Sequence, residues 1–198
     1  MQHASGAHGS LDYRTAIPIP FLAYYPAVIP QSSLSERFVL LNGPAPRSIQ
    51  AGHPPRYAPL TPRKSYNPST SLTLASFGPT TLAPLGSIVE ARSGDKGANI
   101  NVGFFVGTVR RFAWLKTFLT IERMKELMGD DWDEKYSVER VEFKKIRAVH
   151  FVIYGPLGRG VSSSKRLDGL GKGFADFIRD RWVDVPDLFF EETDWAKI

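Results

Sequence analysis

The chain contains no cysteine, which excludes disulfides, thiolate metal sites and cysteine nucleophiles. It also lacks long apolar runs, and no stretch approaches the roughly 20 apolar residues of a membrane span. The N-terminus has no basic region followed by an apolar core, so it does not resemble a secretory signal. Of the four histidines in 198 residues, only His150 follows residue 53. We expect His150 to have a structural role. These absences predict a cytoplasmic protein that does not contact membranes.

Proline is nearly missing from the second part of the chain. Of the 15 prolines, 13 lie in residues 1–84, which therefore cannot form long helices or central strands. Residues 44–84 combine proline with serine and threonine and are expected to be a disordered linker. The apolar stretches before residue 43 make residues 1–43 a candidate remnant of a larger N-terminal domain. Residues 85–190 are expected to form the folded domain.

Excess charge of either sign is also small. Lysine and arginine number 25 against 20 acids, a net charge of +5, and the basic surplus lies mainly before residue 85. Scattered cations without interleaved aromatics argue against nucleic-acid binding. The acids at 130, 131, 133 and 134 are clustered around Trp132 and lack the spacing of a calcium loop. We therefore expect no metal site, and nothing in the sequence calls for a cofactor.

Hydrophobic periodicity predicts six elements after residue 84. The helix starting at residue 112 is expected to break at Thr120, which caps its second part, and the last helix is expected to begin at an Asp168 cap. In chain order the expected elements are strand 85–92, strand 99–106, helix 112–128, strand 137–143, strand 146–154 and helix 168–182.

This order, ββαββα, is a circular permutation of the ferredoxin-like fold. It predicts an α+β domain with a four-stranded antiparallel sheet and both helices on one face. The second strand is expected between the first and the fourth, and the third at an edge. We also expect the second and fourth strands to be parallel. The loop before the second strand and the loop after the fourth strand would then lie at opposite ends of the sheet.

A dense polar segment separates the first two predicted strands. Its chemistry could bind a carboxylate, a phosphate or a carboxamide through Ser93, Gly94, Asp95, Lys96, Gly97, Asn99 and Asn101. Ser93 and Lys96 have the spacing of a lysine-activated serine nucleophile, but the glycines argue against the helix that this chemistry needs. The alternative is structural, with Asp95 paired to Lys96 and the asparagines bonded to the loop backbone.

A second loop, residues 155–166, is rich in glycine, serine and cations. It matches neither a Walker loop nor a dinucleotide-binding fingerprint. Its secondary candidates for binding an anion are Gly158, Arg159, Gly160 and Ser162. A plain surface connection is the alternative interpretation.

An ordered set of motifs covers roughly residues 80–190. It comprises Ser93-Gly94-Asp95-Lys96-Gly97, Asn101-Val102-Gly103, Leu119-Thr120-x-Glu122-Arg123, Phe151-Val152-Ile153-Tyr154-Gly155-x-Leu157-x-x-Gly160 and Leu167-Asp168-x-x-Gly171-Lys172. Together these motifs resemble the C-terminal ferredoxin-fold domain of the acyclic terpene utilisation A (AtuA-like) family. The resemblance implies a role in catabolism of acyclic terpenes through acyl-CoA intermediates. Family members typically carry a much larger N-terminal domain, so we expect a shortened relative.

The sequence leaves three functions open. The first is an accessory domain that binds a small polar ligand, an acyl-CoA or a partner, namely the large family domain acting in trans. The second is an enzyme acting on a branched acyl-CoA or its acid, with Lys96 stabilising charge and Asp95 as general acid or base. The third is a structural module that forms a homo-oligomer.

Overall fold

The computed structural model describes residues 20, 27–54, 56, 58–62, 64–161 and 163–191. The chain divides into two compact units: the smaller is Pro26–Arg63, and the larger comprises Met1–Tyr25 and Lys64–Ile198. In the smaller unit, β1 (Arg37–Leu40) pairs with the antiparallel β2 (Arg47–Gln50), and both strands are exposed. Most of the residues expected to be a remnant, 1–43, lie outside the described residues.

The larger unit is built on a four-stranded sheet with the order β4-β5-β7-β6. Two further strands, β3 and β8, pair with each other as a separate antiparallel ribbon. The elements of this unit are β3 (Thr80–Pro84), β4 (Glu90–Lys96), β5 (Asn99–Phe105), α1 (Val109–Phe118), α2 (Ile121–Met128), β6 (Ser137–Phe143), β7 (Ala148–Tyr154), α3 (Phe174–Arg179), β8 (Trp182–Pro186) and α4 (Leu188–Glu191).

This arrangement confirms the α+β, ferredoxin-like fold with its permuted order of elements. The second strand of the sheet, β5, lies between the first and the fourth, and the third, β6, is at an edge. The third strand has the predicted bounds, and the predicted long helix is divided into α1 and α2. Local periodicity was sufficient here because helices and strands repeat their side-chain directions at different spacings.

The expectation that the second and fourth strands are parallel is wrong. β5 and β7 are antiparallel, with Ile100 opposite Ile153 and Phe105 opposite Ala148. The helical crossover makes β5 and β6 parallel, and β7 lies between them, so it must run opposite to both. The loop that precedes β5 and the loop that follows β7 are consequently at the same end of the sheet.

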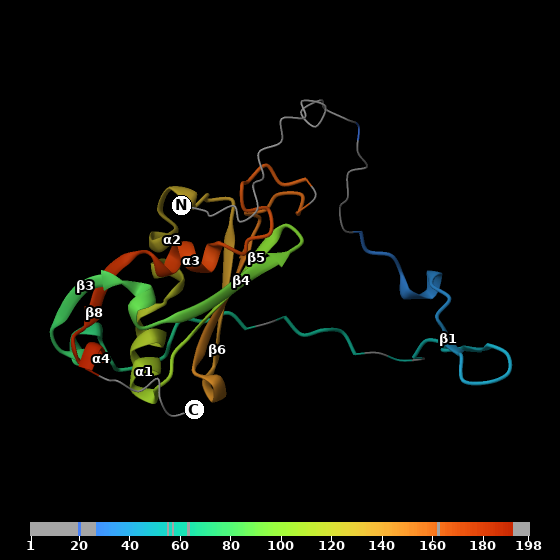
Figure 1. Ribbon diagram of the computed structural model, residues 1–198, viewed down its shortest axis with the longest axis horizontal. Helices are drawn as coiled ribbons and strands as arrows, with labels where there is room; N and C mark the ends of the chain where they lie inside the picture. The colour runs from blue at the N-terminus through green and yellow to red at the C-terminus, as the bar shows by residue number, and fades with distance from the viewer. Residues whose placement is uncertain are drawn as a thin grey trace. The chain divides into compact units, whose positions relative to one another are not determined.

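Helices α1, α2 and α3 lie on one side of the sheet (Figure 1). The core between them is contributed by alternate strand residues such as Val102 and Phe151, both fully buried. Trp114 of α1 stacks on Phe118, with 4.7 Å between ring centroids. In the described part of the chain, no helix has both the length and the apolar character needed to cross a bilayer.

The folded unit begins earlier than residue 85. The predicted linker, 44–84, contains β2 and β3, and β3 pairs with β8 along its whole length. Phe77 is buried and lies 6.3 Å from the ring of Phe189 in α4. Composition does not predict the pairing of β3 or the burial of Phe77. The partners of β3 lie about a hundred residues away, and the contacts of Phe77 are equally remote in sequence.

Thr120 separates the two halves of the predicted helix. Its hydroxyl accepts a hydrogen bond from the backbone N–H of Arg123 at 3.0 Å, which is the N-cap geometry of α2. Asn67 adds a second cap, because its side-chain oxygen accepts from the N–H of Ile121 at 2.9 Å. Its amide group also donates to the carboxylate of Glu122 at 2.8 Å.

Thr120→Ala should lower the free energy of unfolding by about 1 kcal/mol, because the N–H of Arg123 loses its acceptor. Urea denaturation measures this loss. Thr117→Ala is the matched control, since the Thr117 hydroxyl only bonds back to the Ala113 carbonyl within α1; this variant should stay within about 0.5 kcal/mol of the wild type. Equal losses in both variants would contradict the capping role.

Asn67→Ala should raise the pKa of Glu122. Hydrogen bonds from the backbone N–H, and secondly from Asn67, hold this pKa below its usual value of 4.5. The stabilisation is complete above that usual value and is lost as the pH falls through the lower folded value. The variant should therefore lose less stability on acidification. Titration of the Glu122 side chain by NMR in both proteins checks this, and an unchanged pKa contradicts it.

Candidate functional site

The polar segment forms the tip of the β4–β5 hairpin and is shorter as a loop than expected. Only Gly97 and Ala98 form the turn, because Lys96 already pairs with Asn99 across the strands. Gly97 has φ +66°, which glycine adopts without strain at the first position of a two-residue hairpin turn. Residues 93–96, expected in a loop, are therefore strand residues whose directions are set by the pleat.

The pleat separates the predicted site residues onto two sides of the sheet. Ser93 and Asp95 share the side of Val102 and Ile100, which faces the helices. The other side, turned away from the helices, carries Gly94, Lys96, Asn99 and Asn101. The seven residues therefore do not converge on one site.

Ser93 has a structural role. Its hydroxyl donates to the Lys172 carbonyl at 3.1 Å and accepts from the N–H of Ala175 at 2.9 Å. Because the N-cap residue of α3 is Gly173, which has no side chain, Ser93 supplies the missing cap from β4.

The prediction that Asp168 begins a helix is wrong. Helix α3 starts at Phe174, and the two carboxylate oxygens of Asp168 accept from the N–H groups of Lys172 and Gly173. Asp168 therefore shapes the turn that leads into the helix. Trp182, assigned to that helix by its spacing, is the first residue of β8.

The glycine-rich loop after β7 packs on the hairpin tip. The N–H of Leu157 donates to the Ala98 carbonyl at 2.9 Å, and that of Gly155 to the side-chain oxygen of Asn99 at 3.1 Å. Gly160, with φ +93°, is buried, and a Cβ there would lie 3.4 Å from the Gly97 carbonyl oxygen. The positive φ, which an L side chain rarely adopts, therefore accounts for the glycine at position 160. Of the other anion candidates, Gly158 and Arg159 are exposed, and Ser162 lies outside the described residues.

Asp95 and Lys96 are not placed to act together as the enzyme alternative requires, with Asp95 as general acid or base and Lys96 stabilising charge. Lys96 is exposed, and its Nζ donates to the backbone carbonyl of Asp95 at 2.9 Å. The carboxylate of Asp95 is half-buried on the opposite side of the sheet. General acid–base chemistry needs both groups within reach of one substrate, and this geometry separates them. Among the described residues, no group of three or more histidines and acids is placed to hold a metal.

The side of the sheet away from the helices is an extended polar surface, which we call the open face. Its β4–β5 half contains exposed Arg92 and Lys96, with Gly94 and Gly103 between polar neighbours. Phe105 and Phe143, 39% and 49% exposed, lie at its other end. The open face consists of Glu90, Arg92, Gly94, Lys96, Asn99, Asn101, Gly103, Phe105, Ser137, Glu139, Val141, Phe143, Ala148, His150, Val152 and Tyr154.

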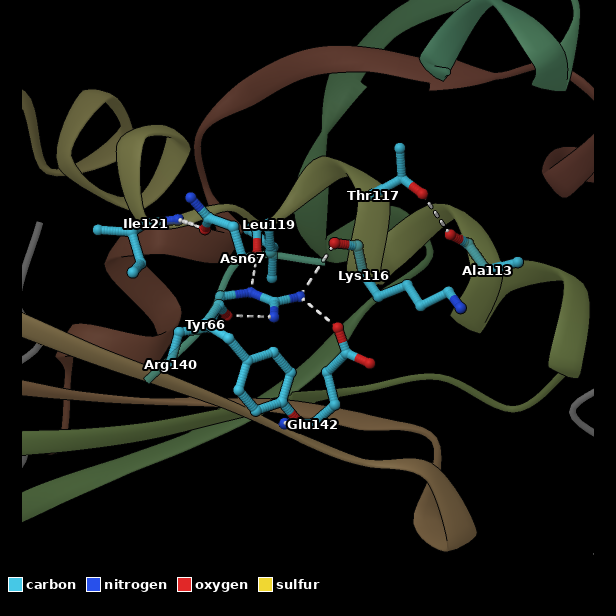
Figure 2. Close-up of polar contacts among 9 residues, drawn as sticks. All are labelled: Tyr66, Asn67, Ala113, Lys116, Thr117, Leu119, Ile121, Arg140 and Glu142. Atoms are coloured by element: carbon cyan, nitrogen blue, oxygen red, sulfur yellow. Dashed lines mark hydrogen bonds and ion pairs between the residues drawn. The ribbon is translucent and has the colours of Figure 1, made fainter. Parts of the chain in front are cut away.

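A second polar centre, which the sequence analysis missed, surrounds Arg140 of β6. This residue is completely buried, and Figure 2 shows its guanidinium bonded to the carbonyls of Leu119, Lys116 and Tyr66 and to the Glu142 carboxylate. Burial lowers the pKa of Arg140, while the hydrogen bond to Glu142 opposes that shift. The alternation of β6 gave a misleading signal, since it favours Val141 and Phe143 as core residues, whereas Phe143 is exposed.

Ser93→Ala should lower the free energy of unfolding by about 1–3 kcal/mol, because the N–H of Ala175 and the carbonyl of Lys172 lose a partner. Ser137→Ala removes an exposed hydroxyl from β6 and should have an effect within about 0.5 kcal/mol. Chemical denaturation of both variants gives the comparison. A stable Ser93→Ala protein would leave this hydroxyl available for another role.

Comparison with known proteins gives one match. The family model of the AtuA ferredoxin-like domain matches residues 83–184, more than half of the chain. Neither the search of the curated proteins nor the search of the solved structures gave a match. The matched span runs from the end of β3 into β8, so it includes the whole four-stranded sheet, α1, α2 and α3. The chain therefore belongs to the AtuA ferredoxin-like domain family.

Proposed function

We propose that this chain is an accessory binding domain of acyclic terpene utilisation, and that its open face docks a partner protein. The observation that carries the proposal is the separation of Asp95 from Lys96 onto opposite sides of the sheet. It favours binding over catalysis, because a pair of this kind cannot act on one bond. The role of Ser93 in capping α3 supports the same choice.

A protein partner fits the open face better than a small molecule does. Small-molecule sites are concave and bury most of their ligand, whereas the open face is one side of a sheet, and two positions of its β4–β5 half, Gly94 and Gly103, lack side chains. Exposed aromatic rings at Phe105 and Phe143 add the apolar contact area that protein interfaces use.

The charge of the open face indicates the chemistry of the partner. Glu90 is paired with Arg179, with 3.2 Å between its carboxylate and the guanidinium. Arg92 and Lys96 lie farther along the same side of β4 and are exposed. The partner should therefore present acidic groups opposite β4. The large domain that family resemblance associates with this module, supplied as a separate chain, is the partner we propose.

Arg92→Glu should weaken binding of a purified large domain from an acyclic terpene utilisation protein by roughly tenfold, with most of the change in the association rate. Arg110→Glu is the matched control, since Arg110 is an exposed arginine on α1, on the side of the sheet away from the open face. Surface plasmon resonance at several salt concentrations measures both. Equal loss in the two variants would contradict docking through the open face.

Absence of any association with the large domain would overturn the proposed partner. Two further measurements then separate the alternatives. Direct binding or turnover of a citronellyl-type thioester would favour the enzyme. Concentration-dependent dimers in sedimentation, weakened by Arg92→Glu, would favour self-association.

A further inference from the structure

We propose that the edge of β6 and the corner between α1 and α2 form a peptide-binding slot, which the chain's own residues Ser65–Asn67 occupy. The slot would accept an extended segment of a partner protein with serine, tyrosine and asparagine in succession. Six hydrogen bonds join the occupying segment to the slot.

Arg140 binds the backbone of Tyr66, the central residue of the occupying segment. Its carbonyl accepts from the N–H of Tyr66 at 3.2 Å, and its guanidinium Nη1 donates to the Tyr66 carbonyl at 3.0 Å. Both backbone polar groups of Tyr66 are thereby paired with a single arginine, and Figure 2 shows the bond from the guanidinium to the Tyr66 carbonyl. This recognition is independent of side-chain identity, as in a strand added to a sheet edge.

Side chains supply the selectivity. The hydroxyl of Ser65 accepts from the N–H of Arg140 at 3.1 Å, and the hydroxyl of Tyr66 accepts from the N–H of Glu142 at 3.1 Å. Asn67 caps α2 through the N–H of Ile121 and donates to Glu122. A segment without these three side chains would leave the same donors of the slot unpaired, at a cost in affinity.

The slot is preorganised without its occupant. Leu119 and Lys116 carbonyls and the Glu142 carboxylate hold the guanidinium of Arg140 at 2.6, 3.0 and 3.0 Å. These contacts leave Nη1 directed at the occupying segment. A fixed site loses little conformational freedom on binding, which favours affinity.

The occupant and the slot belong to different parts of the chain. Every slot residue, from Lys116 to Glu142, lies inside the matched family domain at residues 83–184. Ser65–Asn67 precede that domain. Pro68 also restricts Asn67 to extended conformations, so the segment is suited to bind as a short independent peptide.

A cavity lies beside the occupying segment. Its lining indicates which residue type the slot prefers two positions after the asparagine of a bound segment. Its volume is about 210 Å³, and Ser69 lines it together with Tyr66, Pro68, Lys116, Glu142 and Lys144. Glu142 is already paired with Arg140 at 3.0 Å. The two lysines therefore leave this cavity cationic, and an acidic residue in place of Ser69 would fit it.

The test uses the full chain with its own segment weakened by Tyr66→Ala and Asn67→Ala together. A fluorescent peptide spanning residues 62–71 should bind this double variant roughly tenfold more tightly than wild type, where the tethered segment has an effective concentration of about millimolar. A peptide with the same two substitutions should not bind. Phe105→Ala with Asn101→Ala, which removes one aromatic and one asparagine side chain outside the slot, is the matched control and should bind the peptide as the wild type does.

The Ser69→Glu peptide should bind the double variant roughly threefold more tightly than the unmodified peptide. Adding Lys144→Gln to the protein should abolish that gain. No binding to the double variant, or binding unchanged by the substitutions in the peptide, would overturn the proposal. If the double variant does not fold alone, the added peptide must restore a cooperative melting transition, and failure to do so would equally overturn it.

Discussion

The antiparallel pairing of β5 with β7 is the constraint on which the rest of the domain depends. It puts Ile100 beside Ile153 and so brings the hairpin tip and the glycine-rich loop to one end of the sheet. The loop can then bond to Ala98 and Asn99, and Gly160 can approach Gly97. Some polar groups of the hairpin therefore bond to the glycine-rich loop. The composition of this segment favours ligand binding, but these groups have a structural role.

The buried guanidinium of Arg140 forms the second constraint. A charge without exposure is costly unless every donor has a partner, and this arginine finds partners in two helix-end carbonyls, one carboxylate and the backbone of Tyr66. The result is a polar connection between β6, the α1–α2 corner and a segment from before the domain. It lies on the helix side of the sheet, whereas the open face is turned the other way, so the two proposed surfaces can be occupied together.

Much of the fold could be predicted from local pattern. The bounds of β6 and the cap at Thr120 follow from periodicity and a single hydroxyl, because short-range spacing and capping determine both. The pairing of β3 with β8 and the burial of Phe77 could not be predicted in this way. Their partners are distant in sequence, and the proline content around them suggested a linker.

The sequence by itself determined the four strands of the sheet and the helices between its second and third strands, the strand order and the family, since these depend on periodicity and on motifs readable along the chain. Tertiary structure alone decided which side chains meet. It assigned the hydroxyl of Ser93 to α3, separated Asp95 from Lys96, and put Arg140 rather than Phe143 into the interior. The physical reason is that strand pairing and hydrogen-bond satisfaction are settled between segments far apart in the chain, where local pattern carries no information.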